Sequence, residues 1–234
     1  MRPTTHHPGS RLPAPRAREH GRGRAGLRLP RGTSMKRALD LVLAGLALLP
    51  AILLAALVAL ALRLAQGRPI LFSQERAGLR NEPFRLVKFR TMTDARDEAG
   101  RPLPDDARLT PLGRGLRRLR LDELPQILHV LLGQMSVVGP RPLLPETVSA
   151  LGTLGDKRGQ IRPGLTGWAQ VNGNTLLDLE AKIALDVWYV DHWSFWLDVL
   201  ILAKTVQCVI FGERIRREPI ARAMDHAFGS GRRG

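Results

Sequence analysis

The chain has 234 residues, a formal net charge of +15 and a single cysteine, Cys208. This length is enough for one domain with a hydrophobic core and appended segments. A single cysteine excludes an intrachain disulfide, and the sequence contains no histidine cluster with metal-ligand spacing, no Walker loop and no dinucleotide-binding fingerprint. The positive charge favours a membrane surface, nucleic acid or a phosphorylated substrate as partner.

Residues 1–34 are predicted to form a disordered basic leader, because they are rich in Arg, Pro and Gly and have little apolar periodicity. Residues 1–37 hold ten Lys or Arg and one acidic residue, whereas the chain after Leu41 holds 26 basic and 19 acidic residues. The leader is therefore more basic than the body, as expected of a polybasic segment that binds anionic lipid. The alternative is that translation starts at Met35, which is followed by Lys36 and Arg37, and that the leader is an artefact of the choice of start codon.

Residues 35–66 are predicted to form a membrane helix. Leu41 to Leu62 is a run of 22 residues without a charge, and about 20 apolar residues suffice to cross a bilayer. Pro50 lies near the middle of this run and must kink or break a helix. A kinked spanning helix and a re-entrant helix both fit, but basic residues on both flanks favour the re-entrant form, with both flanks cytoplasmic.

The body, residues 67–212, is predicted to be a mainly helical α+β fold with a small β-hairpin. Residues 70–72 and 84–89 have strand character around a turn at 78–83, and 94–106 is polar and loop-like. Apolar periodicity predicts helices at 112–121, 127–132, 176–190 and 195–211, the last two being amphipathic and interfacial, with Ser194 as a cap. Residues 213–234 are predicted to be a basic, frayed tail.

An acidic pair, Asp122 and Glu123, precedes one of these helices. Pro125 is typical of a first helical turn, so the two carboxylates are expected at the positive end of a helix. Four arginines lie between positions 114 and 120. An ionised carboxylate among cations is suited to phosphate chemistry, although a simple acidic helix cap would have the same local sequence.

Several cations lie in segments that restrict the chain. Arg141 is enclosed by two prolines, which lowers the entropy lost when its guanidinium is fixed on a phosphate. Arg162 also precedes a proline, and Lys88 and Arg90 flank Phe89. Each of these segments could also be a solvated loop or strand face. Trp188, Tyr189, Trp193 and Trp196 are consistent either with a membrane interface or with core packing.

Seven segments, in order, make the chain resemble the monotopic polyprenyl-phosphate phosphoglycosyl transferases, the bacterial sugar transferase family, in its minimal catalytic form. They are residues 36–40, 72–78, 88–92, 121–126, 135–143, 162–173 and 185–189. The resemblance implies a re-entrant helix at a bacterial inner membrane and a catalytic domain on the cytoplasmic face. It departs from the family's common residues at Leu49, Arg120, Gln134 and Asn174.

The resemblance also implies a reaction. A sugar-1-phosphate passes from a nucleotide sugar, usually a UDP-sugar, to undecaprenyl phosphate, UMP is released, and synthesis of a surface glycan such as exopolysaccharide, O-antigen or capsule begins. Asp122 corresponds to the nucleophile that forms a covalent phosphosugar, and Glu123 assists it. Asp122 and Glu123 would hold Mg²⁺. The matching phosphate-binding residues are Lys88, Arg90, Arg117, Arg141 and Arg162.

Two other classes of function compete with this expectation. One is a catalytically silent membrane scaffold of a glycan assembly complex, which would keep the fold without needing the acidic pair. The other is a nucleic-acid binder, which the apolar segment and the lack of a recognisable binding module argue against. The aromatic C-terminal region offers a surface for homo-oligomerisation.

Overall fold

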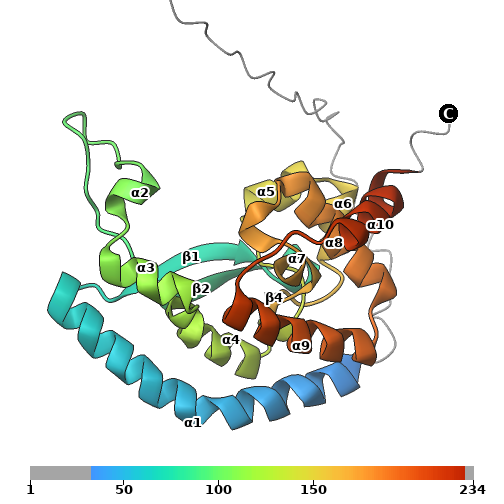
Figure 1. Ribbon diagram of the computed structural model, residues 1–234, viewed down its shortest axis with the longest axis horizontal. Coiled ribbons are helices and arrows are strands. Elements are labelled where there is room, and N and C mark those ends of the chain that lie inside the picture. Colours follow the sequence, from blue (N-terminus) through green and yellow to red (C-terminus); the bar gives the residue numbers. More distant parts are fainter. Residues whose placement is uncertain (1–32, 230–234) are drawn as a thin grey trace, which may run out of the picture.

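The structure is a computed structural model that describes residues 33–229. Within this range the fold is mainly helical with two small sheets (Figure 1). The elements are α1 (Thr33–Gln66), β1 (Leu71–Ala77), η1 (Leu79–Asn81), β2 (Pro83–Phe89), α2 (Asp105–Arg108), α3 (Pro111–Arg118), η2 (Leu121–Gln126), α4 (Ile127–Leu131), β3 (Ser136–Val138), α5 (Pro145–Ala150), α6 (Thr153–Arg158), β4 (Gly164–Thr166), α7 (Trp168–Val171), η3 (Asn174–Leu176), α8 (Leu179–His192), α9 (Phe195–Phe211) and α10 (Arg217–Phe228). The leader predicted for residues 1–34 lies outside the described residues, apart from the two that begin α1.

Helix α1 is long, apolar and bent near its middle, with Pro50 inside it (Figure 1). It is the one described helix long and apolar enough to cross a membrane. Both halves nevertheless pack against the same body. Near the N-terminal end Arg37 donates hydrogen bonds to the last carbonyls of α4, at 2.6 and 2.9 Å, and near the C-terminal end Gln66 donates to Thr110 at 2.9 Å. The body therefore contacts both ends of a helix that would be about 51 Å long if straight.

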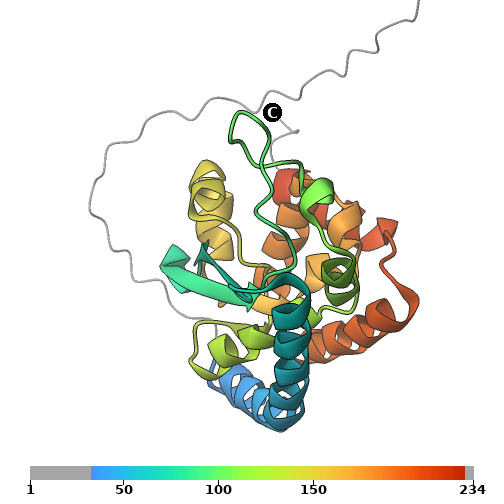
Figure 2. The ribbon, with the colours of Figure 1, turned by 90° about the vertical axis from the view of Figure 1, so that its left-hand side faces the viewer.

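One face of the molecule is covered by exposed apolar side chains. Helix α1 turns a narrow stripe that includes Ala44, Ala51, Val58 and Leu62 toward the body. The opposite side of α1 exposes many leucines, and the residues Leu128, Leu132, Val206, Val209, Ile210 and Phe211 of α4 and α9 are exposed as well. These three helices lie along the same side of the molecule in two perpendicular views (Figures 1 and 2). Such an extended apolar surface is characteristic of a membrane-associated protein.

The predicted hairpin is confirmed, with a longer first strand than expected. β1 and β2 pair antiparallel in register from Leu71 with Phe89 to Ala77 with Pro83. Phe84, Leu86 and Phe89 of β2 are buried. A second sheet pairs β3 and β4 in parallel, which the sequence did not predict because each strand has only three residues.

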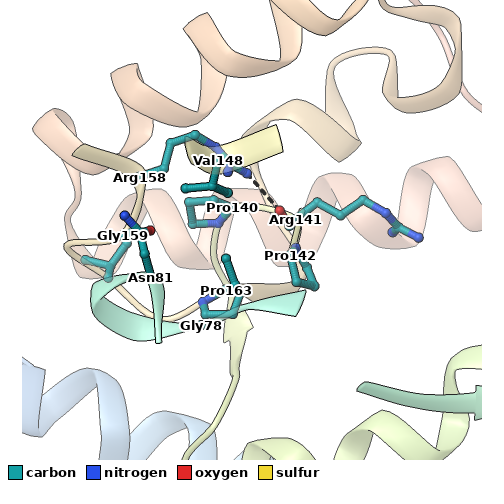
Figure 3. Close-up of a pocket in the computed structure, with 11 residues that line it drawn as sticks. Gly78, Asn81, Pro140, Arg141, Pro142, Val148, Arg158, Gly159 and Pro163 are labelled. Carbon is teal, nitrogen blue, oxygen red and sulfur yellow. Dashed lines mark hydrogen bonds between the residues drawn. The ribbon is translucent and has the colours of Figure 1, made fainter. Parts of the chain in front are cut away.

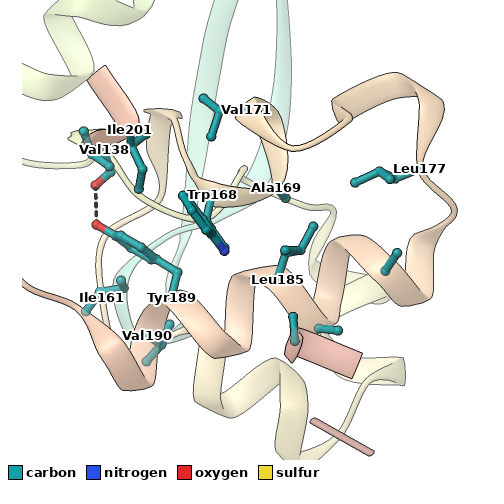
Figure 4. Packing of buried hydrophobic residues seen from close by; sticks show 13 residues of the cluster. Val138, Ile161, Trp168, Ala169, Val171, Leu177, Leu185, Tyr189, Val190 and Ile201 are labelled. Atoms are coloured by element: carbon teal, nitrogen blue, oxygen red, sulfur yellow. Dashed lines mark hydrogen bonds between the residues drawn. The ribbon is translucent and has the colours of Figure 1, made fainter. Parts of the chain in front are cut away.

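The main core lies between α7, α8 and α9 (Figure 4). Tyr189 is fully buried there and donates to Asp198 at 2.6 Å, and its hydroxyl also approaches the carbonyl of Val138. The aromatic cluster thus divides between the two expectations, since Tyr189 belongs to the core whereas Trp196 is 76% exposed. Ser194 caps α9 as predicted, accepting from the amide of Leu197.

Three sequence expectations about helices were wrong. α8 begins at Leu179, because Asp178 caps it by accepting from the amide of Ala181. α3 ends at Arg118, because Arg120 adopts a left-handed conformation with φ of 55°. The segment predicted as a tail from residue 213 instead forms α10, whose Ala223 is fully buried against the rest of the protein.

Candidate active site

The acidic pair lies in a tight turn between α3 and α4. Asp122 and Glu123 occupy the first turn of η2, a 3₁₀ helix that contains Pro125 and leads directly into α4. The expectation of a helix N-terminus is confirmed in position, although the first turn is 3₁₀ rather than α-helical. The left-handed Arg120 reverses the chain, and its carbonyl accepts from the amide of Glu123 at 3.2 Å. Asp122 is only 5% exposed.

Electrostatics around Asp122 are set by burial and by neighbouring charges. Burial and the adjacent Glu123 raise the pKa of Asp122, while Lys88 and Arg117 oppose this increase. Burial lowers the pKa of Lys88, although Asp122 and Glu123 favour its charged form. Arg117 is held by a hydrogen bond from Nε to the hydroxyl of Thr91 at 2.9 Å. Lys88 and Arg117 therefore favour the ionised form of this carboxylate, against the effect of burial.

Arg141 reaches the acidic turn from a rigid loop. Its guanidinium forms an ion pair with Glu123 at 2.6 Å. Arg158, paired with the buried Asp186 at 2.8 Å, donates to the carbonyl of Arg141 at 2.7 Å. This anchor lies beside a small pocket of about 10 Å³, and the side chain of Arg141 points away from it (Figure 3). Gly139 leaves no room for a Cβ against the carbonyl of Arg162, so the loop packs tightly on the chain before β4.

The acidic pair and the cations around it, Lys88, Arg117 and Arg141, line an open cavity of about 1020 Å³. Eight of its lining residues are basic and five are acidic, so the cavity as a whole attracts anions. The basic residues are Arg76, Lys88, Arg90, Arg108, Arg117, Arg118, Arg120 and Arg141. The Nε atoms of Arg76, Arg90 and Arg108 are buried without a protein partner among the described residues. The volume suits a nucleotide-sized ligand, and the basic lining suits its phosphates.

The structure brings together most of the cations selected from the sequence, but not all of them. Lys88, Arg117 and Arg141 surround the acidic pair, and Arg90 lines the same cavity while pairing with Asp94 at 3.0 Å. Arg162 does not line the cavity. Its Nε donates to the carbonyl of Gly133 at 2.7 Å, so this side chain ties the segment before β4 to the end of α4.

One wall of the cavity is formed by Asn174 and Thr175 of η3 and by Glu213 after α9. Asn174 was singled out from the sequence only as a departure from the family's common residues, and Thr175 and Glu213 were missed. Arg76 and Arg108 were also missed as cavity residues, although Arg76 lies in segment 72–78 of the family resemblance. Only their charge distinguishes Arg76 and Arg108 in the sequence, and the cavity is formed by short segments spread from Phe72 to Glu213.

Asp122 and Glu123 are the carboxylates of the acidic turn that could hold a divalent cation. No group of three or more His, Cys, Asp and Glu side chains with metal-binding geometry occurs in residues 33–229. Mg²⁺ is commonly held by only one or two carboxylates together with substrate phosphates, and Asp122 and Glu123 meet that requirement in a cavity suited to phosphates. The donor set therefore fits Mg²⁺ bound together with a substrate, rather than alone.

A buried carboxylate in a cationic cavity, beside an apolar face, is the arrangement expected of a membrane-associated transferase of phosphorylated substrates. The sequence profile of the bacterial sugar transferases matches residues 31–212. The chain belongs to the bacterial sugar transferase family, a family of polyprenyl-phosphate phosphoglycosyl transferases.

Three relatives illustrate the range of similarity. The chain is 52% identical over 155 residues to the uncharacterized sugar transferase EpsL of Bacillus subtilis, covering 66% of this chain and 77% of that protein. It is 34% identical to the exopolysaccharide production protein ExoY of Rhizobium meliloti, covering 77% and 87%. It is 44% identical to the undecaprenyl-phosphate glucose phosphotransferase of Komagataeibacter xylinus, covering 75% of this chain but only 36% of that longer protein.

Proposed function

We propose that this enzyme transfers a sugar-1-phosphate from a UDP-sugar to undecaprenyl phosphate and releases UMP. The names of its relatives support both substrates, including the UDP-glucose:undecaprenyl-phosphate glucose-1-phosphate transferase of Escherichia coli, which is 38% identical over 182 residues. The observation that carries the proposal is the buried Asp122 carboxylate between Lys88 and Arg117. The product would begin a surface polysaccharide.

The reaction proceeds in two displacements. A carboxylate oxygen of Asp122 attacks the β-phosphorus of the donor, a bond forms between them, and the bond from this phosphorus to the bridging oxygen breaks so that UMP leaves with that oxygen. An oxygen of the acceptor phosphate then attacks the same phosphorus and displaces Asp122. Lys88, Arg117 and Arg141 stabilise the charge that develops on the phosphate oxygens in both steps.

Glu123 has a separate role in this mechanism. Its ion pair with Arg141 orients the guanidinium toward the acidic turn. Mg²⁺ held by Asp122 and Glu123 with the substrate would neutralise part of the diphosphate charge.

The bent α1 supports a re-entrant topology at the inner membrane. Arg37 and Gln66, near opposite ends of the helix, both contact the catalytic body, so the two ends lie on one side of the helix's exposed middle. With the catalytic body on the cytoplasmic face, the cavity has access to a soluble donor. The apolar residues Val209, Ile210 and Phe211 line the cavity and also belong to the apolar face, which gives a lipid phosphate a route from the bilayer.

The first experiment is UMP release by purified protein in detergent, with Mg²⁺, undecaprenyl phosphate and a panel of UDP-sugars. We expect release with at least one donor and loss of release by three or more orders of magnitude in Asp122→Asn, because an amide is a poor nucleophile. A phosphosugar adduct on the wild-type protein should be detected by mass spectrometry when the acceptor is omitted. Asp122→Asn with wild-type turnover would reject the nucleophile, and a fully inactive wild type with every nucleotide sugar would favour the silent scaffold.

A further inference from the structure

Glu213 is placed in the cavity by a segment that begins where the family match ends. The match covers residues 31–212. Gly212 has a φ of 82°, a left-handed conformation that suits glycine, and it turns the chain away from the end of α9. Glu213 follows directly and lines the cavity, with 24% of its side chain exposed.

Glu213 collects hydrogen bonds from two separate parts of the cavity wall. Its Oε1 accepts from Nη2 of Arg120 at 3.1 Å and from the side-chain amide of Asn174. Its Oε2 accepts from the amide and hydroxyl of Thr175 at 3.2 and 2.5 Å. A carboxylate has about four acceptor positions, so these four bonds fill the capacity of Glu213. Glu213 therefore holds other groups in place rather than binding a ligand itself.

The groups held by Glu213 do have capacity for a ligand. Arg120 carries five N–H groups, and the described contacts engage its guanidinium only with Glu213. Its side chain is 29% exposed in the cavity, two positions before Asp122. Asn174 and Thr175 present an amide and a hydroxyl at the same wall. Guanidinium, amide and hydroxyl groups are suited to the hydroxyls of a sugar ring.

The segment that carries Glu213 is fastened beyond the cavity as well. The amide of Arg216 donates to the carbonyl of Asn172 at 3.1 Å. Further along, α10 packs against α8, and His226 and Lys157 both contact the carboxylate of Asp191, at 2.8 and 2.6 Å. Glu213 thus lies between the end of α9 and these attachments, which limits the freedom of its segment before a ligand binds.

We propose that Glu213 is a positioning residue for donor binding, because it holds Arg120, Asn174 and Thr175 as a wall that contacts hydroxyl groups of the nucleotide sugar. The inference rests on the proposed function for the identity of the donor. The hydroxyls belong either to the transferred hexose or to the ribose, which have the same hydrogen-bonding chemistry.

The test is a steady-state comparison of full-length wild type and Glu213→Gln with the active donor. We expect the donor KM to rise about tenfold, because a change of this size corresponds to the loss of one charge-assisted hydrogen bond. The kcat should stay within about threefold of the wild-type value, and the acceptor KM should be unchanged. The matched control is Glu218→Gln, the same change in an exposed pair with Arg222 on α10, which should leave both constants unchanged. A lower kcat at constant donor KM would overturn the proposal, since a purely structural role reduces the active fraction only.

Two further variants examine the contact itself. Glu213→Asp keeps the charge with a shorter reach and should raise the donor KM less than Glu213→Gln does. Arg120→Gln combined with Glu213→Gln should raise the donor KM by less than the product of the two single effects, because both changes remove the contact between Arg120 and Glu213. Independent, additive effects would contradict the positioning role.

Equilibrium binding of UDP-glucose and UMP to the same variants keeps the test separate from catalysis. If Glu213→Gln weakens UMP and the nucleotide sugar equally, the wall contacts the ribose; if only the nucleotide sugar is weakened, it contacts the hexose. Unchanged binding of both ligands, together with an unchanged KM for the donor that is turned over, would reject the proposal. Failure of the wild type to release UMP would count against the proposed function alone.

Discussion

At the scale of single residues, the buried charges serve two different purposes. Asp122 is buried among cations from three elements, β2, α3 and the loop after β3, and it lines the cavity. Lys36 and Asp198 form a second buried pair, at 2.6 Å, and Tyr189 and Trp193 complete the hydrogen bonding of Asp198 at 2.6 and 3.1 Å. This second cluster joins α1 to α9 and lies apart from the cavity lining.

Removing Lys36 should therefore destabilise the fold without altering the site directly. Lys36→Met leaves the carboxylate of Asp198 buried without its cation, a change that commonly costs about 3–5 kcal/mol. We expect a clearly lower thermal unfolding midpoint in detergent. Arg101→Met, which removes an exposed pair with Asp97, is the matched control and should cost at most about 1 kcal/mol. Equal shifts for the two variants would mean that the buried pair does not hold α1 to the body.

At the scale of elements, Pro50 and the polar ends of α1 determine how the helix meets the bilayer. The native Cys208 is first replaced by serine, and single cysteines are placed at Ser34 and Glu75, both exposed on either side of the apolar run. A membrane-impermeant maleimide should label neither position in intact cells and both after permeabilisation. Labelling of position 34 alone in intact cells would establish a spanning helix.

The attachment of α10 should depend on pH. Although burial raises it, hydrogen bonds from Lys157 and His226 keep the pKa of Asp191 below its ordinary value. A lowered pKa in the folded state adds stability above the ordinary value of 3.8, and this contribution is lost as the pH falls through the lowered value. Asp191→Asn should unfold at a lower temperature than wild type at pH 7, and the difference between the two midpoints should narrow as the pH falls below about 3.8. A difference that stays constant as the pH falls below this value would show that the carboxylate charge is not responsible.

At the scale of the whole molecule, the apolar face and the cavity form one functional surface. Helices α1, α4 and α9 expose apolar side chains along one side, and the end of α9 reaches the cavity lined by Arg117 and Asp122. The proposed reaction in two successive displacements would let a soluble donor and a membrane-bound acceptor use this shared location in turn.

Local sequence signals predicted much of this arrangement. The uncharged run around Pro50, the strand character of the hairpin and Ser194 before α9 are signals that depend on neighbours a few residues away. The structure confirms the helix, the hairpin and the helix cap that they predicted. The start of α8 and the end of α3 differ by about three residues, because caps and a left-handed residue override apolar periodicity. The short strands β3 and β4 escaped notice, since three residues are too few to establish a period.

The sequence by itself determined the long apolar helix, the acidic turn and the family, because these depend on composition, local spacing and motif order. Only the tertiary structure decided that Arg76 and Arg108 enter the cavity, that Arg162 does not, and that Glu213 closes one wall. Those positions depend on contacts between segments distant along the chain, such as the bond between Arg120 and Glu213. A cation has the same appearance in a sequence whether its partner is a carbonyl, a carboxylate or a substrate, and only packing selects among them.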